Sequence, residues 1–403
     1  YIFERNAGGT NAWGEVRKIT ASDAAVNDYF GSSVSAAGDV VAVGAYGKSS
    51  NQGATYIFER NAGGTNAWGE VRKITASDAA AGDYFGVSVG VSGDVIAVGA
   101  RAKNGARGAA YIFERNAGGT NAWGEVRKVT ASDPVAGDYF GGSVSASGDV
   151  VAVGAQGKSG SQGAAYIFER NAGGTNAWSQ ARKMVAADAA AGDFFGQSLS
   201  AAGSLVAVGA YGKSSARGAA YLFQRNAGGA SYWTQVRALS ASDAAAGDAF
   251  GAAMSLAGDI LVAGAPNRSG YRGAAYVYTK LPDDWQEMKQ AAASDSVAND
   301  QLGASVDLDG DVLAAGAPVR NSGQGGVYVY ECKAGGSNNW GEAVILAPPD
   351  PANGDNFGRS VSVAGDVIVA GAPAKNGSQG AAYIFERNAG GTNAWGFVIK
   401  LIP

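Results

Sequence analysis

Pairs of acidic residues five positions apart occur once in each of seven similar segments of the sequence. The pairs are Asp23/Asp28, Asp78/Asp83, Asp133/Asp138, Asp188/Asp193, Asp243/Asp248, Asp295/Asp300 and Asp350/Asp355. A basic residue follows the second aspartate of each pair by 20 positions. These bases are Lys48, Lys103, Lys158, Lys213, Arg268, Arg320 and Lys375. Paired carboxylates are typical of glycoside hydrolysis and of calcium binding.

The repetition of these groups argues against catalysis. An active site needs one asymmetric set of side chains, whereas the acidic pair recurs in every segment. A feature needed seven times is typical of loop shaping, in which aspartates accept backbone N–H groups in Asx-turns. Two interpretations of the seven bases stay open. They pair with the aspartates, or they form a basic ring on one face that binds an anionic ligand such as an acidic polysaccharide.

The remaining composition favours a protein that is not an enzyme. The sequence has no histidine and one cysteine, Cys332, so Ser-His-Asp and Cys-His arrangements are excluded. The remaining enzymatic alternative is a polysaccharide-active enzyme that uses carboxylates outside the repeated pattern. A net charge of −4 without basic clusters argues against nucleic-acid binding. Apolar runs such as 205–208 are too short for membrane insertion.

The groups that could do chemistry lie in a repeat of about 55 residues. Its starts are Tyr1, Tyr56, Tyr111, Tyr166, Tyr221, Tyr276, Tyr328 and Tyr383. In the first complete unit we expect strand A at 32–36, B at 40–43, C at 54–59 and D at 68–74. Four short strands per unit, with no helical pattern, predict an all-β fold of seven four-stranded antiparallel blades, a seven-bladed β-propeller. We expect residues 1–403 to form this single domain.

Each blade is built on a Phe-Gly pair, which becomes Leu-Gly once. The first residues of these pairs are Phe30, Phe85, Phe140, Phe195, Phe250, Leu302 and Phe357. Together with Gly-Ala-Pro at 264–266 and the Gly-Ala-Ala-Tyr-Ile-Phe strand, this pattern resembles the FG-GAP repeat of integrin-α-like propellers. The segment 75–86 is similar to the form found in bacterial secreted and surface proteins. The resemblance implies a non-enzymatic recognition or adhesion module, extracellular or on the cell surface, with a protein or glycan ligand.

Propellers of this family carry calcium loops of the Asp-x-Asp-x-Asp-Gly type in the A–B turn. The nearest match here is Asp307-Leu-Asp309-Gly-Asp311. It supplies three carboxylates but lacks the length and the downstream ligand of a calcium loop. We therefore expect no required cofactor and a possible calcium site at this cluster, with a polar hairpin of solvated acids as the alternative.

Tryptophan occurs eight times, always at the same position of the unit. A ring of indoles could stack sugars, which would make the chain a carbohydrate-binding propeller. One indole per blade on strand D is also typical of packing between blades.

The repeats contain one C–D hairpin too many for seven blades. Seven A–B pairs accompany eight C–D hairpins, and 1–14 is identical to 383–396. Either terminal copy could complete the blade built on Phe357. The surplus N-terminal hairpin at 1–20 is interpreted as the trimmed end of a preceding blade, as a hairpin donated to another molecule, or as part of an incomplete eighth blade. Because the chain begins within a repeat, we expect it to be a processed or shortened polypeptide.

The last C–D hairpin has an apolar outer face. Phe397 and Ile399 replace the Glu15 and Arg17 of the first copy, and Leu401 follows. We expect this interface of Phe397, Ile399 and Leu401 to be covered by a following domain or a neighbouring subunit, with tolerated sequence drift as the alternative. With the surplus hairpin, it favours a second function class, a structural protein that self-assembles into a homo-oligomer or filament.

Overall fold

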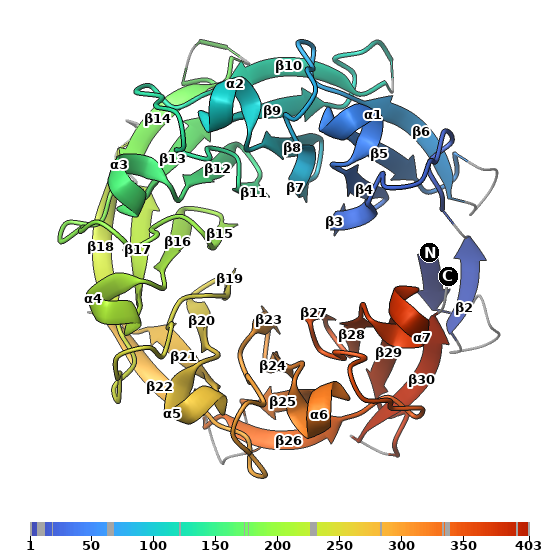
Figure 1. Cartoon of the computed structure of the whole chain (residues 1–403), viewed down its shortest axis with the longest axis vertical. Helices are drawn as coiled ribbons and strands as arrows, with labels where there is room; N and C mark the ends of the chain where they lie inside the picture. Colours follow the sequence, from blue (N-terminus) through green and yellow to red (C-terminus); the bar gives the residue numbers. More distant parts are fainter. Residues whose placement is uncertain are drawn as a thin grey trace.

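The structure is a computed structural model that describes residues 2–5, 13–17, 19–62, 68–120, 122–172, 174–175, 177–225, 232–282, 284–332, 334, 339–391 and 394–401. These residues form seven four-stranded antiparallel sheets in a ring, and one two-stranded sheet (Figure 1). The predicted all-β, seven-bladed architecture is therefore confirmed. None of the helices in the described residues has the length and apolar character that a bilayer crossing requires.

The blades follow one another around the ring in chain order. Blade 1 consists of β3 (Phe30–Ala37), β4 (Val40–Ala45), β5 (Ala54–Glu59) and β6 (Gly69–Ile74). Blade 2 consists of β7 (Phe85–Ser92), β8 (Val95–Ala100), β9 (Ala109–Glu114) and β10 (Gly124–Val129). Blade 3 consists of β11 (Ser143–Ser147), β12 (Val150–Ala155), β13 (Ala164–Glu169) and β14 (Ser179–Met184). Blade 4 consists of β15 (Leu199–Ala202), β16 (Leu205–Ala210), β17 (Ala219–Arg225) and β18 (Trp233–Leu239).

The second half of the ring has the same plan. Blade 5 consists of β19 (Met254–Ala257), β20 (Ile260–Ala265), β21 (Ala274–Lys280) and β22 (Trp285–Ala291). Blade 6 consists of β23 (Ser305–Asp309), β24 (Val312–Ala317), β25 (Gly326–Glu331) and β26 (Gly341–Leu346). Blade 7 consists of β27 (Ser360–Ala364), β28 (Val367–Ala372), β29 (Ala381–Arg387) and β30 (Trp395–Leu401). In each blade these are strands A to D, from the centre of the ring outward.

The strands of blade 1 lie close to the positions predicted from the sequence. Strand C coincides with the predicted 54–59, and the other three differ by one or two residues at an end. Gly38 makes the A–B turn possible because its φ of 59° lies in the left-handed region, which costs glycine little. The sequence pattern did not predict the one-turn helix in each B–C loop. These helices are α1 (Lys48–Asn51), α2 (Lys103–Ala106), α3 (Lys158–Ser161), α4 (Lys213–Ala216), α5 (Arg268–Tyr271), α6 (Arg320–Gly323) and α7 (Lys375–Ser378).

The hydrophobic core lies between neighbouring blades. Val95 and Ile112 of blade 2 pack in one cluster with Val151 and Tyr166 of blade 3, and all four side chains are fully buried. Strand B is apolar along its whole length because both of its faces meet a neighbouring blade. The small residues of strand A allow the innermost strands to approach one another near the axis.

The indoles of blades 2 to 7 each lie at the interface with the preceding blade. Trp123 of blade 2 is fully buried and donates a hydrogen bond of 2.6 Å from Nε1 to Glu59 of blade 1. The Arg115 guanidinium lies 5.4 Å from the Trp123 ring centre and donates to Asp39 of blade 1 at 3.1 Å. The tryptophans therefore pack and hold the blades together, as one of the two interpretations predicted.

The surplus hairpin forms the two-stranded sheet. β1 (Ile2–Arg5) and β2 (Trp13–Arg17) pair only with each other among the described residues, whereas β29 and β30 complete blade 7. The C-terminal copy thus completes the blade built on Phe357. Figure 1 shows the β1–β2 hairpin on the outer side of the ring, between blades 7 and 1. The seven complete blades leave this position open toward the axis.

Candidate functional site on the loop face

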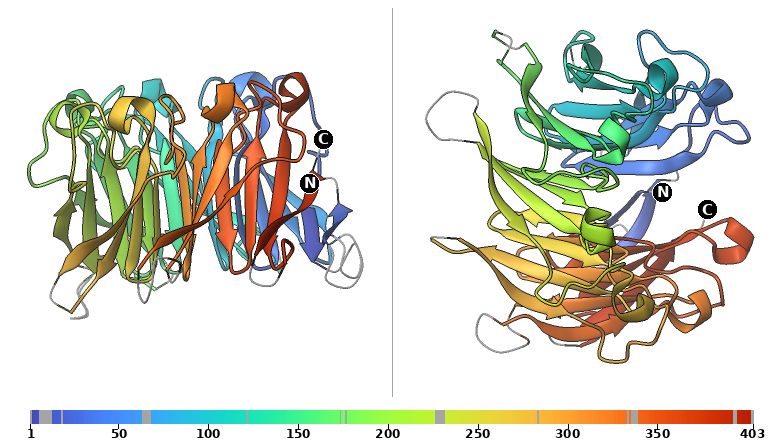
Figure 2. Two further views of the ribbon diagram at one scale, coloured as in Figure 1. Left: turned by 90° about the horizontal axis from the view of Figure 1, so that it is seen from below. Right: turned by 60° about the vertical axis from the view of Figure 1, so that its left-hand side comes forward.

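The D–A loops, which join successive blades, and the B–C loops emerge on the same face of the ring. Figure 2 shows the helical turns of the B–C loops along this edge in the side view. We call it the loop face. It carries the acidic pairs and the seven bases that the sequence singled out.

The bases lie among their aspartates. Lys48 is 7% exposed, and its Nζ donates to Asp28 Oδ2 at 2.9 Å and to the backbone carbonyl of Asp23. Asp28 Oδ2 also accepts the Ala25 N–H at 2.7 Å, which closes the turn between the two aspartates. Equivalent contacts to the second aspartate are made by Lys103, Lys158, Lys213 and Lys375. The acidic pair thus shapes the D–A loop and fastens it to the B–C loop.

Arginine at the same position pairs with the first aspartate of the loop and not with the second among the described contacts. Arg268 Nε donates to Asp243 at 2.9 Å, and Arg320 donates to Asp295 at 2.5 Å. The pairing interpretation of the bases therefore describes the structure. Binding of an anionic ligand by the basic ring stays a prediction, and such a ligand would have to compete with these carboxylates.

The first aspartate of each pair also accepts a tyrosine hydroxyl. Asp23 Oδ1 accepts from Tyr56 at 2.5 Å, and its Oδ2 accepts from Lys73 at 2.6 Å. The Lys73 hydrogen bond, followed by that of Tyr56, lowers the pKa of Asp23 well below its ordinary value. Burial, and then the same hydrogen bond to Asp23, raises the pKa of Tyr56. The carboxylate is thereby held ionised and the phenol neutral.

The hydrogen bond between the first aspartate and the tyrosine recurs in every blade, and the strand-D lysine joins it in blades 1, 2, 3 and 7. In blade 2, burial opposes ionisation of Asp78, but hydrogen bonds from Lys128 and Tyr111 outweigh it and lower its pKa from 3.8 to about 2. The pKa is likewise lowered for Asp133, Asp188, Asp243, Asp295 and Asp350. None of these seven aspartates has the raised pKa that a general acid at neutral pH requires.

The structure does not bring the Asp307, Asp309 and Asp311 carboxylates together. Asp307 accepts the Val363 N–H at 2.8 Å, and Asp309 accepts the Gly365 N–H at 2.8 Å. Asp311 instead lies 3.7 Å from an arginine guanidinium of blade 7. In the part of the chain that the structure describes, no group of three or more His, Cys, Asp or Glu side chains could hold a metal ion. Calcium binding at this cluster stays a prediction.

The predicted interface residues lie on β30. Phe397 is 40% exposed, and its ring centre lies 5.8 Å from that of Phe385. Ile399 is half-buried, and Leu401 is 9% exposed. Leu401 lines a groove on one face of blade 7. Coverage of these side chains by a following domain or a neighbouring subunit stays a prediction.

The structure gives a reason for an uncharged residue at position 397, where the other blades carry a polar one. The equivalent Glu70 accepts the Ser22 N–H at 2.9 Å and the Ser22 hydroxyl at 2.8 Å. The residue equivalent to Ser22 in the last repeat is Pro349, which has neither donor. The acceptor and both donors were therefore replaced together.

A feature of the loop face that the sequence reasoning missed is the residue before each Phe-Gly pair. It is aromatic in the first four blades, as Tyr29, Tyr84, Tyr139 and Phe194. Their φ angles are 54°, 58°, 55° and 55°, in the left-handed region that bulky residues rarely adopt. The signal in the sequence was an aromatic residue at this position in four consecutive blades.

These rings form a surface with two more aromatic residues. Tyr46 stacks on Tyr29 with ring centres 4.9 Å apart, and lies 5.8 Å from Tyr84 of the next blade. Tyr211 stacks on Phe194 at 5.0 Å. We call these six residues the aromatic stripe: Tyr29, Tyr46, Tyr84, Tyr139, Phe194 and Tyr211.

Glycines in the B–C loops make room for the stripe. A Cβ added at Gly47 would lie 2.6 Å from the Tyr29 ring, and one at Gly157 would lie 2.9 Å from the Tyr139 ring. The rings therefore lie directly over the loop backbone. Tyr29 and Tyr139 remain 54% and 41% exposed, so both can contact a ligand.

The ring of four-stranded antiparallel blades defines the chain as a β-propeller. A family model described as "FG-GAP repeat" matches residues 13–58, 68–113, 123–168, 178–223, 233–278, 285–330 and 340–385. The chain belongs to the FG-GAP repeat family, as its resemblance to that repeat indicated. FG-GAP repeats are typical of extracellular proteins.

Among solved structures, the chain is similar to the crystal structure of Sqt1 from Chaetomium thermophilum. The two share 12% sequence identity with a TM-score of 0.56, over 94% of this chain and 88% of Sqt1. This likeness concerns the fold alone. No curated protein matches the sequence.

Proposed function

We propose that the chain is a non-enzymatic recognition module that acts outside the cell or on its surface and binds a glycan through the aromatic stripe. The observation that carries this proposal is an aromatic ring at one position of four consecutive blades, exposed at Tyr29 and Tyr139 and half-buried at Tyr84 and Phe194. Aromatic faces offer large, rigid contact areas, and the tyrosine hydroxyl adds a hydrogen-bonding group.

The fold does not require aromatic side chains at this position. Blades 5 to 7 carry Ala249, Gln301 and Asn356 there, with φ angles of 60°, 59° and 57°. The loop therefore demands the left-handed conformation in every blade, and only the first four combine it with an aromatic ring. Strained conformations of bulky residues are typical of binding sites. This supports selection of the rings for contact with a ligand.

The electrostatics of the loop face support binding without catalysis. The first aspartates have lowered pKa values and are ionised at neutral pH. Each of these aspartates lies within ion-pair distance of a lysine or arginine. The six rings of the stripe are themselves uncharged, with the Arg101 guanidinium 5.8 Å from the Tyr84 ring centre, and their flat faces suit the sugar rings of a neutral glycan.

The proposal is tested by titrating the chain with neutral and acidic oligosaccharides in isothermal calorimetry, after a glycan-array screen. We expect binding to a neutral glycan, and at least a tenfold loss in the variant Tyr29→Ala/Tyr84→Ala/Tyr139→Ala/Phe194→Ala. Gln301→Ala, at the same position of blade 6, is the control and keeps the affinity. No glycan binding by the unmodified chain, or equal binding by the quadruple variant, would overturn the proposal.

A second candidate is a structural protein that self-assembles. Its motivation is the β1–β2 hairpin, which pairs only with itself among the described residues, together with the exposed Phe397 ring on β30. An exposed sheet edge is a ready site for pairing with another chain. An oligomeric state that is unchanged after deletion of residues 1–20, as measured by light scattering, would contradict assembly through this hairpin.

A further inference from the structure

One face of each blade receives the Phe-Gly pair of the next blade. Gly53 of blade 1 forms a parallel bridge with Phe85 of blade 2. Five more bridges of this kind join successive blades: Gly108/Phe140, Gly163/Phe195, Gly218/Phe250, Gly273/Leu302 and Gly325/Phe357. The equivalent residue of blade 7 is Gly380, and it forms no such bridge with any described residue.

The contacts around strand B of blade 7 show the same missing neighbour. In blade 6, a Cβ added at Gly316 would overlap the Gly358 carbonyl of blade 7, and Ser305 Oγ donates to that carbonyl at 2.9 Å. The equivalent residues of blade 7 are Gly371 and Ser360. A Cβ at Gly371 would meet only atoms of Ser360. The space for a carbonyl group is present, but no blade supplies one.

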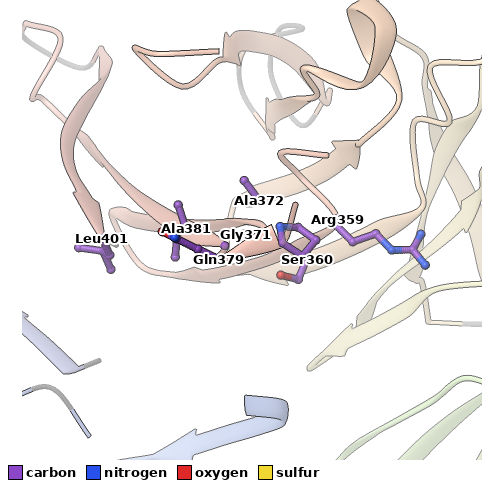
Figure 3. Close-up of a pocket in the computed structure, with 10 residues that line it drawn as sticks. Arg359, Ser360, Gly371, Ala372, Gln379, Ala381 and Leu401 are labelled. Atoms are coloured by element: carbon purple, nitrogen blue, oxygen red, sulfur yellow. The ribbon is translucent and has the colours of Figure 1, made fainter. Parts of the chain in front are cut away.

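Residues on this face of blade 7 are less buried than their equivalents in other blades, as expected for a face without a neighbour. Every residue of β24 in blade 6 is buried, whereas buried and half-buried residues alternate along β28 in blade 7. Ala381 and Ala382 are half-buried, whereas their equivalents Ala164 and Ala165 are fully buried. The uncovered face forms a groove of about 380 Å³, and Figure 3 shows its lining residues along one side of blade 7.

The opposite side of the open position carries the complementary residue. Phe30 of blade 1 is half-buried, whereas Phe85 and Phe140 of the next blades are fully buried. The β1–β2 hairpin stands between blades 7 and 1 on the outer side, where strands C and D of a blade would lie (Figure 1). What the position lacks is strands A and B.

We propose that this groove, the open-position groove, binds a β-hairpin with the A–B sequence of the repeat, donated by a separate FG-GAP polypeptide. The incoming Phe-Gly pair would bridge Gly380, its glycine carbonyl would accept the Ser360 hydroxyl, and its second strand would pair with β1. Six interfaces of this kind within the chain define the occupant. The proposal goes beyond glycan recognition and does not depend on it.

The test uses a peptide with the sequence of residues 135–156, which contains strands A and B of blade 3. Calorimetric titration of the chain is expected to show one site. Replacing the peptide phenylalanine that corresponds to Phe140 with alanine should weaken binding at least tenfold, because this side chain enters the apolar part of the groove.

Variants of the chain identify the groove as the site. Gly371→Ala should abolish peptide binding, because its Cβ would occupy the place of the incoming carbonyl. Ser360→Ala should weaken binding severalfold by removing a donor. Ser198→Ala is the matched control, since the Ser198 hydroxyl makes the contact equivalent to that of Ser360 in the closed interface between blades 4 and 5, where it donates to the Gly251 carbonyl at 2.6 Å.

A second measurement avoids dependence on a peptide that folds alone. Residues 135–165 joined directly before Tyr1 should raise the melting temperature, and Gly371→Ala should remove the gain. No peptide binding together with no thermal gain would overturn the proposal, as would equal effects in Gly371→Ala. Oligomers of the unmodified chain that disappear in Gly371→Ala and persist with peptide would also overturn it, because a second copy would then fill the groove.

Discussion

Trp233 Nε1 of blade 4 donates a hydrogen bond of 2.6 Å to Glu169 of blade 3, a carboxylate with no exposed surface. Arg225 Nε of blade 4 lies 2.9 Å from the same carboxylate. A buried charge is tolerated when it is paired and hydrogen-bonded. These contacts connect two blades, and the hydrogen-bonded pair Trp233 and Glu169 lies 64 residues apart in the chain.

Removal of the Glu169 carboxylate should therefore destabilise the ring. We expect Glu169→Ala to lower the free energy of unfolding by about 1–3 kcal/mol, because it leaves the buried Trp233 N–H without an acceptor, while Arg225 keeps its pairing with Asp149. Glu169→Gln should cost less, because its amide oxygen still accepts from Trp233. Urea unfolding followed by tryptophan fluorescence measures both. Equal stability of Glu169→Ala and the unmodified chain would show that this carboxylate does not stabilise the interface between blades 3 and 4.

Blade 5 lacks the hydrogen bond that corresponds to the one between Trp233 and Glu169. Trp285 Nε1 is buried and has no hydrogen-bond partner, and the position of Glu169 is occupied by Gln224. We expect Gln224→Glu to stabilise the chain by about 1 kcal/mol, because a carboxylate is a stronger acceptor for the Trp285 N–H than the Gln224 amide oxygen, which makes no hydrogen bond to it. Gln224→Ala is the control and should bring no gain. An unfolding midpoint lower in Gln224→Glu than in Gln224→Ala would be the contrary result.

The lowered aspartate pKa values predict acid sensitivity. Asp78 and Asp133 have a pKa of about 2 in the folded chain against the ordinary 3.8. Because the folded-state pKa is the lower one, ionisation stabilises the fold above pH 3.8, and this stabilisation is lost as pH falls toward about 2.

Melting temperatures between pH 7 and pH 2 measure this loss. Asp78→Asn should flatten the decline, because its side chain no longer titrates. Asp259→Asn, in the A–B turn of blade 5, should leave the slope unchanged. A decline of equal steepness in Asp78→Asn and the unmodified chain would show that Asp78 is not involved.

Equivalent glycines should respond differently at closed and open interfaces. Gly316→Ala forces a Cβ against the Gly358 backbone and should cost about 1–3 kcal/mol or more, as overpacked cores do. Gly371→Ala meets only the Ser360 side chain and should cost clearly less. Guanidinium unfolding of both variants checks the difference, and equal losses would mean that blade 7 is covered in the free chain.

A substitution at Tyr139 should affect stability and glycan affinity in different directions. Tyr139→Gly relieves a left-handed conformation that costs a bulky residue about 1–2 kcal/mol, so the melting temperature should hold or rise while glycan affinity falls. Ala249→Gly changes the equivalent residue of blade 5 without removing a ring and should leave affinity unchanged. A loss of glycan affinity in both variants would assign the effect to the backbone instead of the ring.

Much of the fold could be predicted from the repeat alone. Gly38 and Asp39 mark a tight turn, the apolar run 40–43 marks a doubly covered strand, and both signals are local. The role of the bases could not be chosen from sequence, because Lys48 meets Asp28 only when the B–C and D–A loops share a face. The aromatic stripe could not be predicted, because Tyr46 meets Tyr29 and Tyr84 only when the loops of successive blades share a face.

The sequence by itself determined the number, length and order of the strands, because turn type and strand burial depend on residues close together in the chain. It did not decide which terminal hairpin completes blade 7, since 1–14 and 383–396 are identical. In the tertiary structure the C-terminal copy completes blade 7, and the connection between the strands explains this. Strand β29 follows β28 through a short loop, and closing a short loop costs less entropy than pairing β28 with Ile2 at the other end of the chain. The open-position groove is the consequence of that choice.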